Sequence, residues 1–297
     1  MYTVDTPYNI LVSFAYMYTN EKFTRDAFFA HRDERINLMV DSGAFTLHNA
    51  QQGRPWLNLD TYCKFLQKYG QWCEKYVQLD VVGNEQASKR NYEEMVRRGL
   101  KPMYVLTMFD KDWSYFRNTM NVNPHCCIAG GVTTKGDWVV KRFQDAFRHS
   151  NEQAKIHGLG YVTYPKMLQL PLYSVDSSSW SAGMRYGTIP YFNNGIKGIS
   201  LNDVKKGTKV PLELRQIFSE YKITPKMFMD RSYHTGTKSI GNFCSILAWL
   251  RYQEYCYRHG LRLFLAIAQP SQLVAYLRLQ QDRHDMTYQD FRNYDNN

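Results

Sequence analysis

The segment Ile36-Asn37-Leu38-Met39-Val40-Asp41-Ser42-Gly43-Ala44-Phe45 joins a mostly apolar run to a short row of small and polar residues. An apolar run of this length predicts a buried strand, and the serine and glycine after it predict a turn where the strand ends. A second segment, Leu172-Tyr173-Ser174-Val175-Asp176-Ser177-Ser178-Ser179-Trp180, has the same pattern. Both segments therefore place an aspartate at the carboxyl end of a buried strand.

Outward from these two segments, short apolar runs alternate with longer helical patterns. The predicted strands are Ile10–Ala15, Ile36–Val40, Tyr76–Leu79, Met103–Thr107, Cys126–Ala129, Tyr161–Thr163, Leu172–Val175 and Leu263–Ala268. The predicted helices are Leu59–Cys73, Glu85–Arg98, Trp113–Met120, Gly136–His157, Pro211–Tyr221, Asn242–His259 and Ser271–Gln281. This alternation indicates an α/β fold with a parallel sheet, and eight strands suit a (β/α)8, or TIM-like, barrel. A doubly wound open sheet is the structural alternative.

The length and composition of the chain bound its organisation. Its 297 residues suffice for one large domain or two small ones, and the hydrophobic share of 44% is typical of a globular protein. No internal repeat or low-complexity linker divides the sequence. We expect a single barrel domain over residues 1–297 with an elaborated C-terminal segment, in which about residues 190–260 form an insertion or elaboration late in the barrel.

Two aspartates are the candidate catalytic residues. Barrel active sites gather at the carboxyl ends of the strands, which is where Asp41 and Asp176 are predicted to lie. Asp176 could attack a sugar C1′ and form a covalent glycosyl-enzyme. Asp41 could protonate the departing base and later take a proton from an incoming one. The alternative for both residues is a structural cap of the following helix or turn.

The candidate substrate-binding residues lie at the same strand ends. Asp80 could accept hydrogen bonds from the N1–H and amino groups of a guanine-like base, or else cap a helix. Gly130 and Gly131 would let a flat ligand approach the backbone, although a tight turn is the common alternative. Phe45 could stack on the base or pack in the core. The hydroxyl of Ser42 is a further candidate contact.

The charge of the chain favours a polyanionic partner. Lys and Arg number 37 against 27 Asp and Glu, which gives a formal net charge of +10. Lys and Arg neutralise phosphates when a protein binds nucleic acid, although an ordinary basic enzyme has the same composition. Arg185 follows the proposed nucleophile and could hold a phosphate, with Lys205 and Lys206 extending that contact. Solvated lysines are the alternative.

The cellular compartment of the protein is predicted from the absence of targeting and membrane-spanning patterns in the sequence. We find no signal peptide at the N-terminus and no run of about 20 apolar residues, so we expect no membrane span. The six cysteines show no secretory framework, and reduced cysteines in a cytoplasm are the expectation.

At these residues the chain resembles the tRNA-guanine transglycosylase superfamily. It most resembles the shorter branch found in phages and bacteria, the 7-deazaguanine DNA transglycosylases. The shared points are Asp-Ser-Gly-x-Phe at 41–45, Asp80 at a strand end, Gly130-Gly131, and Ser-Val-Asp-Ser-Ser-Ser-Trp at 174–180. The resemblance spans roughly residues 36–187.

The resemblance implies an enzyme that exchanges guanine in nucleic acid for a 7-deazaguanine, with no redox cofactor or ATP. It makes Asp176 the nucleophile and Asp41 the general acid and base, with Asp80 and the Gly130-Gly131 backbone recognising the base. DNA is the favoured substrate and tRNA the alternative. A non-catalytic nucleic-acid-binding barrel and a glycosylase that hydrolyses the intermediate are further alternatives. The location would be the host cytoplasm if a phage encodes the protein.

One departure from the family concerns zinc. The tRNA enzymes carry a structural zinc on a Cys-x-Cys-x-x-Cys run with a later His, and this spacing is absent here. Cys244, Cys256 and His259 could supply three ligands, with His234 as a fourth. Because Cys244 and Cys256 fall on one predicted helix, buried free cysteines are the preferred interpretation, and we expect no metal. Whether the protein forms a homodimer stays open.

Overall fold

The computed structural model describes residues 6–18, 35–49, 56–130, 137–182 and 187–293. The chain divides into two compact units. The first, called the sheet unit, comprises Asp5–Ser177 and His259–Ala268. The second, called the helical unit, contains Ser178–Arg258 and Gln269–Asn297, which overlaps the segment expected as an insertion.

The sheet unit is built on eight parallel strands. They are β1 (Tyr8–Ser13), β2 (Ile36–Asp41), β3 (Lys75–Tyr76), β4 (Tyr104–Thr107), β5 (His125–Ala129), β6 (Lys155–Gly158), β7 (Leu172–Ser177) and β10 (Arg262–Ile267). Their order is β3-β2-β1-β10-β7-β6-β5-β4. Every residue of β1 is buried, as expected of a parallel strand that is covered on both faces. The α/β class and the parallel sheet are therefore confirmed.

The two edge strands of this order, β3 and β4, meet at one point. Val77, directly after β3, forms an isolated parallel bridge with Met103, directly before β4. The Met103 N–H donates to Tyr76 O at 2.8 Å, and the Gln78 N–H donates to Met103 O at 3.1 Å. The described residues show no longer ladder between these strands, so the sheet is curled until its edges touch at a single bridge.

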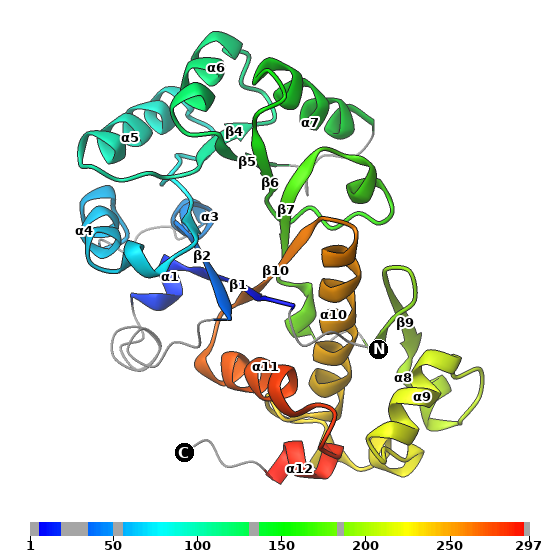
Figure 1. Ribbon diagram of the computed structural model, residues 1–297. Coiled ribbons are helices and arrows are strands. Elements are labelled where there is room, and N and C mark those ends of the chain that lie inside the picture. The colour runs from blue at the N-terminus through cyan, green and yellow to red at the C-terminus, as the bar shows by residue number, and fades with distance from the viewer. Residues whose placement is uncertain (1–5, 19–34, 50–55, 131–136, 183–186, 294–297) are drawn as a thin grey trace. The chain divides into compact units, whose positions relative to one another are not determined.

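Helices follow most strands of the sheet unit. They are α1 (Phe14–Met17), α3 (Ala44–Asn49), α4 (Leu59–Tyr69), α5 (Glu85–Arg97), α6 (Trp113–Val122) and α7 (Asp137–His149), with short 3-10 turns η1 (Gly70–Trp72) and η2 (Lys166–Gln169). In Figure 1 the helices α4 to α7 lie around the outside of the curled sheet. Each buries an apolar side, such as Val139 and Phe143 of α7.

The inside of the curled sheet is filled with apolar side chains. One cluster is made of Leu11, Met39, Val77, Met103, Val105, Cys127 and Phe264, with Ala129, Leu159 and Ala266 packed against it. These residues come from strands all along the sheet, which is how small barrels fill their interior. Because the interior is packed, polar chemistry in this unit has to lie at the strand ends.

The helical unit combines a hairpin with helices. Its elements are η3 (Ser179–Ala182), β8 (Thr188–Phe192), β9 (Ile196–Ser200), α8 (Leu201–Lys205), α9 (Leu212–Glu220), η4 (Pro225–Phe228), η5 (Arg231–Tyr233), α10 (Ile240–Arg258), α11 (Pro270–Asp282) and α12 (Tyr288–Asn293). The strands β8 and β9 pair antiparallel. Most of α10 is buried around its whole circumference, so it forms the centre of this unit.

Two local predictions are corrected. The strand predicted at Tyr161–Thr163 is wrong, because those residues lie in a loop and the strand is β6. The helix predicted to end at His157 ends at His149 instead. Asn151 and Glu152 then adopt positive φ angles of 55° and 61°, which interrupt the helix and lead the chain into β6.

Two further observations concern compartment. Across the described ranges, no helix is both long and apolar enough to cross a membrane. All six cysteines are free thiols, and five of them are buried.

Candidate active site

The carboxyl ends of β2, β6 and β7 bring together the polar side chains of the candidate site. In the ladders, Ser13 of β1 pairs with Asp41 of β2, and Asp176 of β7 pairs with Phe264 of β10. His157 of β6 pairs with Ser174 of β7. All these strands are parallel, so their carboxyl ends lie at one edge of the sheet. The edge carries the two predicted catalytic aspartates and a histidine.

Asp176 lies inside β7 with only 9% of its surface exposed. Its Oδ1 accepts a hydrogen bond from the Gly160 N–H at 2.7 Å and lies 3.1 Å from His157 Nε2. Within the described residues, Oδ2 accepts no hydrogen bond from the protein. The interpretation of Asp176 as a helix cap is therefore wrong, since its carboxylate binds donors from β6 and the turn after it.

Asp41 is the last residue of β2, and its Oδ2 accepts a hydrogen bond from the Gly43 N–H at 3.0 Å. Burial raises the pKa of Asp41 above its ordinary value, and the negative charge of Asp176 raises it further, while the Gly43 N–H opposes both. The charge of Asp176 therefore contributes to the pKa of Asp41. A carboxyl in this setting holds its proton more readily than an exposed one.

Gly43 explains the Asp-Ser-Gly sequence in physical terms. Its φ angle is +82°, and a Cβ added to it would lie 2.8 Å from the Cβ of Ala15. Only glycine fits both conditions, so the turn that delivers its N–H to Asp41 depends on it. Ser42, predicted to contact substrate, is fully buried, and its Oγ accepts from the Ala44 N–H at 3.4 Å.

Asp80 follows β3 and is partly buried. Burial raises its pKa to about 7, with a further contribution from the charge of Asp41. The cap interpretation of Asp80 is wrong, because the N-cap of α5 is Asn84, whose Oδ1 accepts from the Ala87 N–H at 3.0 Å. The negative charges of Asp41 and Asp176 thus each raise the pKa of a neighbouring carboxyl group, that of Asp80 and that of Asp41 respectively.

Gly130 and Phe45 also follow strands of the sheet unit, β5 and β2. Gly130 directly follows β5 and has a φ of +88°, and an added Cβ would come within 3.1 Å of Met108 Cγ. Phe45, on α3, is 72% exposed, so the core interpretation of this ring is wrong. Gly131 lies outside the described residues. The structure therefore leaves Phe45 available to a ligand and keeps Gly130 close to the loop after β4.

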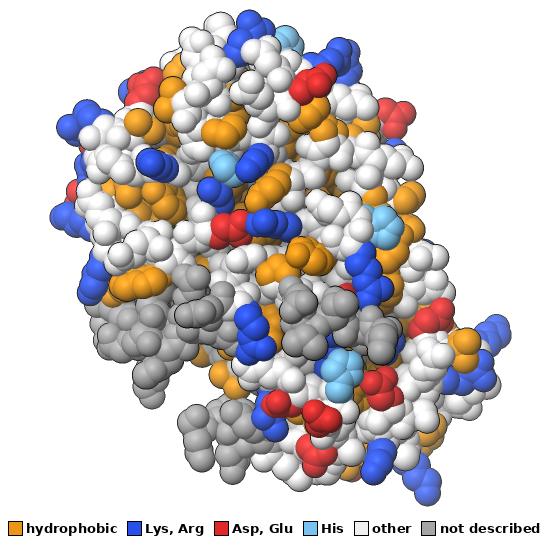
Figure 2. Space-filling view, in the orientation of Figure 1, with side chains coloured by type: hydrophobic (Ala, Val, Ile, Leu, Met, Phe, Trp, Pro, Cys, Tyr) orange, Lys and Arg blue, Asp and Glu red, His pale blue; other side chains and the backbone are white. Residues whose placement is uncertain are grey.

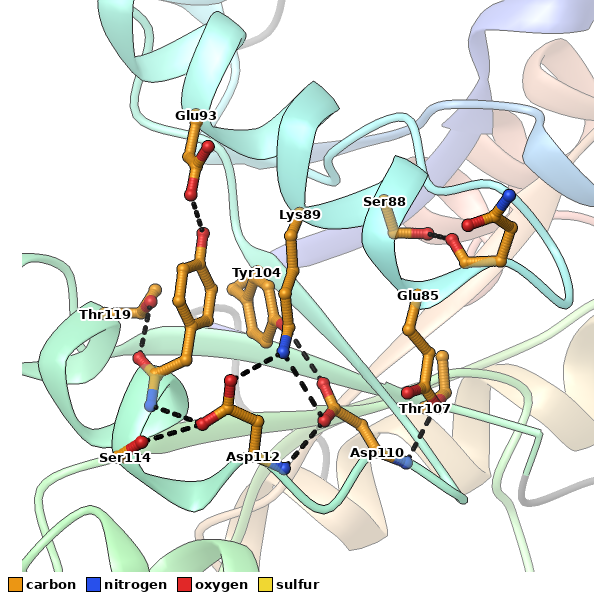
Figure 3. A network of polar contacts seen from close by, with 12 residues as sticks. Glu85, Ser88, Lys89, Glu93, Tyr104, Thr107, Asp110, Asp112, Ser114 and Thr119 are labelled. Atoms are coloured by element: carbon orange, nitrogen blue, oxygen red, sulfur yellow. Dashed lines mark hydrogen bonds and ion pairs between the residues drawn. The ribbon is translucent and has the colours of Figure 1, made fainter.

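A buried polar network holds the loop after β4. The Lys89 ammonium lies 3.0 Å from Asp112 Oδ2 and 3.8 Å from Asp110 Oδ1 (Figure 3). The Tyr104 hydroxyl donates to Asp110 Oδ2 at 3.1 Å. Lys89 and Asp110 are both buried, and each charge has its partner, as buried ions require.

A second set of bonds fixes the backbone of this loop. Arg142 Nη2 donates to Thr107 O at 2.6 Å and to Asp110 O at 2.7 Å. With the loop held at both ends, Met108 packs against Gly130, and Phe109 points its ring to solvent with 74% of its surface exposed. The network is thus a scaffold for one side of the strand-end edge.

The predicted nucleic-acid-binding residues belong to the helical unit. Lys205 is the last residue of α8 and is partly buried, and Lys206 follows it and is exposed. Neither lysine forms an ion pair with any described residue. Arg185 lies outside the described residues.

The residues considered for zinc are not assembled into a ligand group. Over the described residues, no three His, Cys, Asp or Glu side chains are grouped as metal ligands. Cys244 and Cys256 are both fully buried in α10. Burial raises the pKa of each thiol to about 12.

His157, Ser174 and Gly160 are site residues that the sequence does not predict. The predicted helix runs through Lys155-Ile156 and ends at His157, so the sequence does not place the histidine on a strand. The signal that could have found it is the Ser150-Asn151-Glu152 turn, because asparagine favours positive φ and marks the end of α7.

No family model matches the chain, and no curated protein matches it. A function for this chain therefore has to be inferred from the geometry of the three carboxylates and of His157.

Proposed function

We propose that this protein is a base-exchange transglycosylase, which replaces guanine in DNA by a 7-deazaguanine through a covalent glycosyl-aspartate intermediate. One observation carries the proposal. Three carboxylates, those of Asp41, Asp80 and Asp176, lie at or beyond the carboxyl ends of parallel strands and have different environments. Asp176 is buried and its Oδ1 binds two donors, whereas Asp41 and Asp80 are partly buried. Pairs of carboxyl groups with different environments are what enzymes use to divide nucleophile and acid roles at a glycosidic bond.

In the first displacement, Asp176 Oδ2 forms a bond to C1′ of the target nucleotide, and the bond from C1′ to N9 of guanine breaks. Oδ2 is the suitable atom because both hydrogen bonds to Asp176 end on Oδ1. The electron pair of the broken bond leaves with guanine, and Asp41 supplies the proton that the base needs. The raised pKa of Asp41 suits this acid role.

In the second displacement, the glycosidic nitrogen of the incoming base attacks C1′. Its proton passes to the Asp41 carboxylate, and the C1′–Oδ2 bond breaks, which returns Asp176 as a carboxylate. Two displacements retain the configuration at C1′. The bonds broken and formed are alike, so no external energy source is needed.

Asp80 is assigned to base recognition. As a carboxylate it accepts hydrogen bonds from the N1–H and amino group that guanine and 7-deazaguanines share. Phe45 would stack on the base, and the backbone after β5 at Gly130 and Gly131 would contact its edge. Ser42, buried under the turn, would act through the position of Asp41 and α3.

The sheet unit is proposed to be a (β/α)8 barrel. The strand order supports this interpretation, because β1, β2 and β3 are neighbours in chain order, as are β4 to β7, and β10 lies between β7 and β1. The Val77–Met103 bridge then joins the two series at the place where a barrel would close.

Nucleic acid as the partner is supported by charge. The chain carries a formal net charge of +10, and Figure 2 shows Lys and Arg side chains scattered over the described part of the visible face, interspersed with Asp and Glu. DNA is preferred over tRNA because the cysteine run that holds zinc in the related tRNA enzymes is absent. The target base would have to leave the helical stack to reach Asp176.

The decisive experiment tracks both the leaving and the entering base. Guanine-labelled duplex DNA and, separately, guanine-labelled tRNA are incubated with the protein and a panel of 7-deazaguanines. We expect guanine release and equal base incorporation on DNA. The same result on tRNA alone would replace DNA by tRNA, release without incorporation would identify a glycosylase, and no release from either would overturn the proposal.

The lysines after α8 give a separate prediction about binding. Changing Lys205 and Lys206 together to glutamate should weaken DNA binding and flatten its salt dependence. Each lost phosphate contact lowers the slope of log Kd against log salt by about 0.9. We therefore expect a slope change of about 1.8 in a titration between about 50 and 200 mM salt.

The matched control changes the same charge elsewhere. Lys64 of α4 and Lys101, which precedes β4, are both exposed lysines of the sheet unit. Their double glutamate variant has the same net charge and should retain the wild-type slope. Equal slope changes in the two double variants would show that net charge alone acts and would remove Lys205 and Lys206 from the interface.

A further inference from the structure

We propose, on the basis of the proposed function, that His157 is a positioning residue for the nucleophile Asp176. Ser174 fixes one side of the imidazole ring, and the Nε2–H on the other side donates to Asp176 Oδ1. This hydrogen bond orients the carboxylate so that Oδ2 faces C1′. The pairing is direct. His157 Nε2 lies 3.1 Å from Asp176 Oδ1, and Nδ1 lies 2.8 Å from Ser174 Oγ.

The hydrogen bond to Asp176 places a proton on Nε2 of the ring. A carboxylate oxygen only accepts, so the bond to Asp176 requires the proton on Nε2. The Ser174 hydroxyl can then donate to Nδ1, which keeps the proton on the opposite nitrogen. Because Ser174 and Asp176 are both on β7, one strand supplies the nucleophile and the group that orients its partner.

The packing around His157 restricts rotation of its imidazole ring. His157 and Ser174 are each only 1% exposed. The Phe264 ring, on β10, meets the imidazole edge to face with centroids 6.1 Å apart and an interplanar angle of 79°. Phe264 is also the ladder partner of Asp176, so β6, β7 and β10 fix the pair from both sides.

Gly160 supplies the second hydrogen-bond donor to Asp176 Oδ1. Its N–H donates to the same oxygen at 2.7 Å, and its φ of +65° belongs to the left-handed region that favours glycine. Two donors on one oxygen leave the carboxylate little rotation about its Cβ–Cγ bond. They also stay on Oδ1 when it becomes the ester carbonyl, and they stabilise the charge that returns to it in the second displacement.

The kinetic test uses three substitutions. His157→Leu removes the donor, and kcat should fall about 10- to 100-fold with KM changed by less than about twofold, since loss of alignment acts on the chemical step. His157→Gln keeps an N–H donor near the Nε2 position and should recover most of the activity. Ser174→Ala should lie between them, because the ring loses the partner that fixes its tautomer.

His125 provides the matched control. It is a partly buried histidine of the same sheet at the start of β5, the opposite end from Asp176. His125→Leu should leave kcat unchanged. If His157→Leu behaves like it, or if His157→Gln is as impaired as His157→Leu, the positioning role is overturned while base exchange by the wild type stands.

A spectroscopic readout separates the inference from the activity. In 15N-labelled protein, the His157 ring should show a proton on Nε2, and the Nε2 signal should shift in Asp176→Ala. A ring without a proton on Nε2 overturns the inference whatever the activity. A wild-type protein that neither releases guanine nor forms an adduct with DNA overturns the proposed function, and the positioning role falls with it.

Discussion

Asp176→Asn is expected to abolish base exchange while leaving the protein folded. The amide oxygen can still accept from the Gly160 N–H and from His157, so both hydrogen bonds to Oδ1 are preserved. The amide is not a nucleophile, and removal of a covalent nucleophile lowers kcat by about 10⁴-fold or more. The wild type should form a covalent adduct with DNA that survives denaturing electrophoresis, and the variant should form none.

The control for this variant is the same chemical change at an exposed site. Asp60 of α4 binds Lys64 and Arg98 on the surface. Asp60→Asn should retain exchange within about twofold, since exposed ion pairs contribute little. Exchange by Asp176→Asn within about tenfold of wild type would place the nucleophile elsewhere. Loss of its folding transition would restore a structural role for Asp176.

Asp80→Asn is expected to stabilise the protein at alkaline pH and to impair its function. The pKa of Asp80 is raised from 3.8 to about 7 by burial and by Asp41. The folded state therefore keeps a proton that the unfolded state has lost between these pH values, and stability falls as pH rises through that window. The Asp80→Asn variant has no titrating group at this position, so its stability does not fall in that window.

The size of the stability gain in Asp80→Asn follows from the increase in the pKa of Asp80 on folding. About three pKa units correspond to roughly 4 kcal/mol, which is the upper bound for the gain of Asp80→Asn at about pH 8. Near about pH 4 the two proteins should unfold at the same denaturant concentration, and the difference should grow up to about pH 7. Denaturant titrations at several pH values measure this. A gain that is equal at low and high pH would contradict the assigned pKa.

Function should change in the opposite direction. An amide turns a donor towards the N1–H or amino group of the base, so kcat/KM for the incoming base should fall about 10- to 100-fold. In the wild type, base affinity should fall below about pH 7, where Asp80 is protonated. Asp112→Asn is the contrasting control, because hydrogen bonds lower the pKa of Asp112 to about 2. Removing this carboxylate should therefore destabilise the folded protein at high pH.

The strands next to the predicted site were recognisable because they are buried on both faces. Ile36–Val40 is almost wholly apolar, and β2 begins at the same residue and ends at Asp41. In β7 the strand continues through Asp176 and Ser177, which the polar sequence did not indicate. The pairing with β10 imposes that extension, and pairing between distant segments cannot be read from local sequence.

The missed features share a physical cause. The helical pattern of α7 continues in sequence past its real end, and only the positive φ angles at Asn151 and Glu152 stop it. The β8–β9 hairpin was not predicted, although Asn194-Gly195 in its turn is a strong hairpin signal. Asp41 ends β2 and Asp176 is the penultimate residue of β7, close to the predicted strand ends, whereas Asp80 lies four residues after β3. The environments of these carboxylates depend on the folded structure and were not predictable from local sequence.

The position of β10 has a consequence for how the protein is made. This strand pairs with both β1 and β7, yet the whole segment Ser178–Arg258 precedes it in the chain. Contacts between residues so distant in sequence form late, because closing a long loop is entropically unfavourable. Until Ile267 has left the ribosome, the strand that carries Asp176 thus lacks one of its two neighbours. A nascent chain would therefore lack a complete candidate site until the residues up to Ile267 had been synthesised.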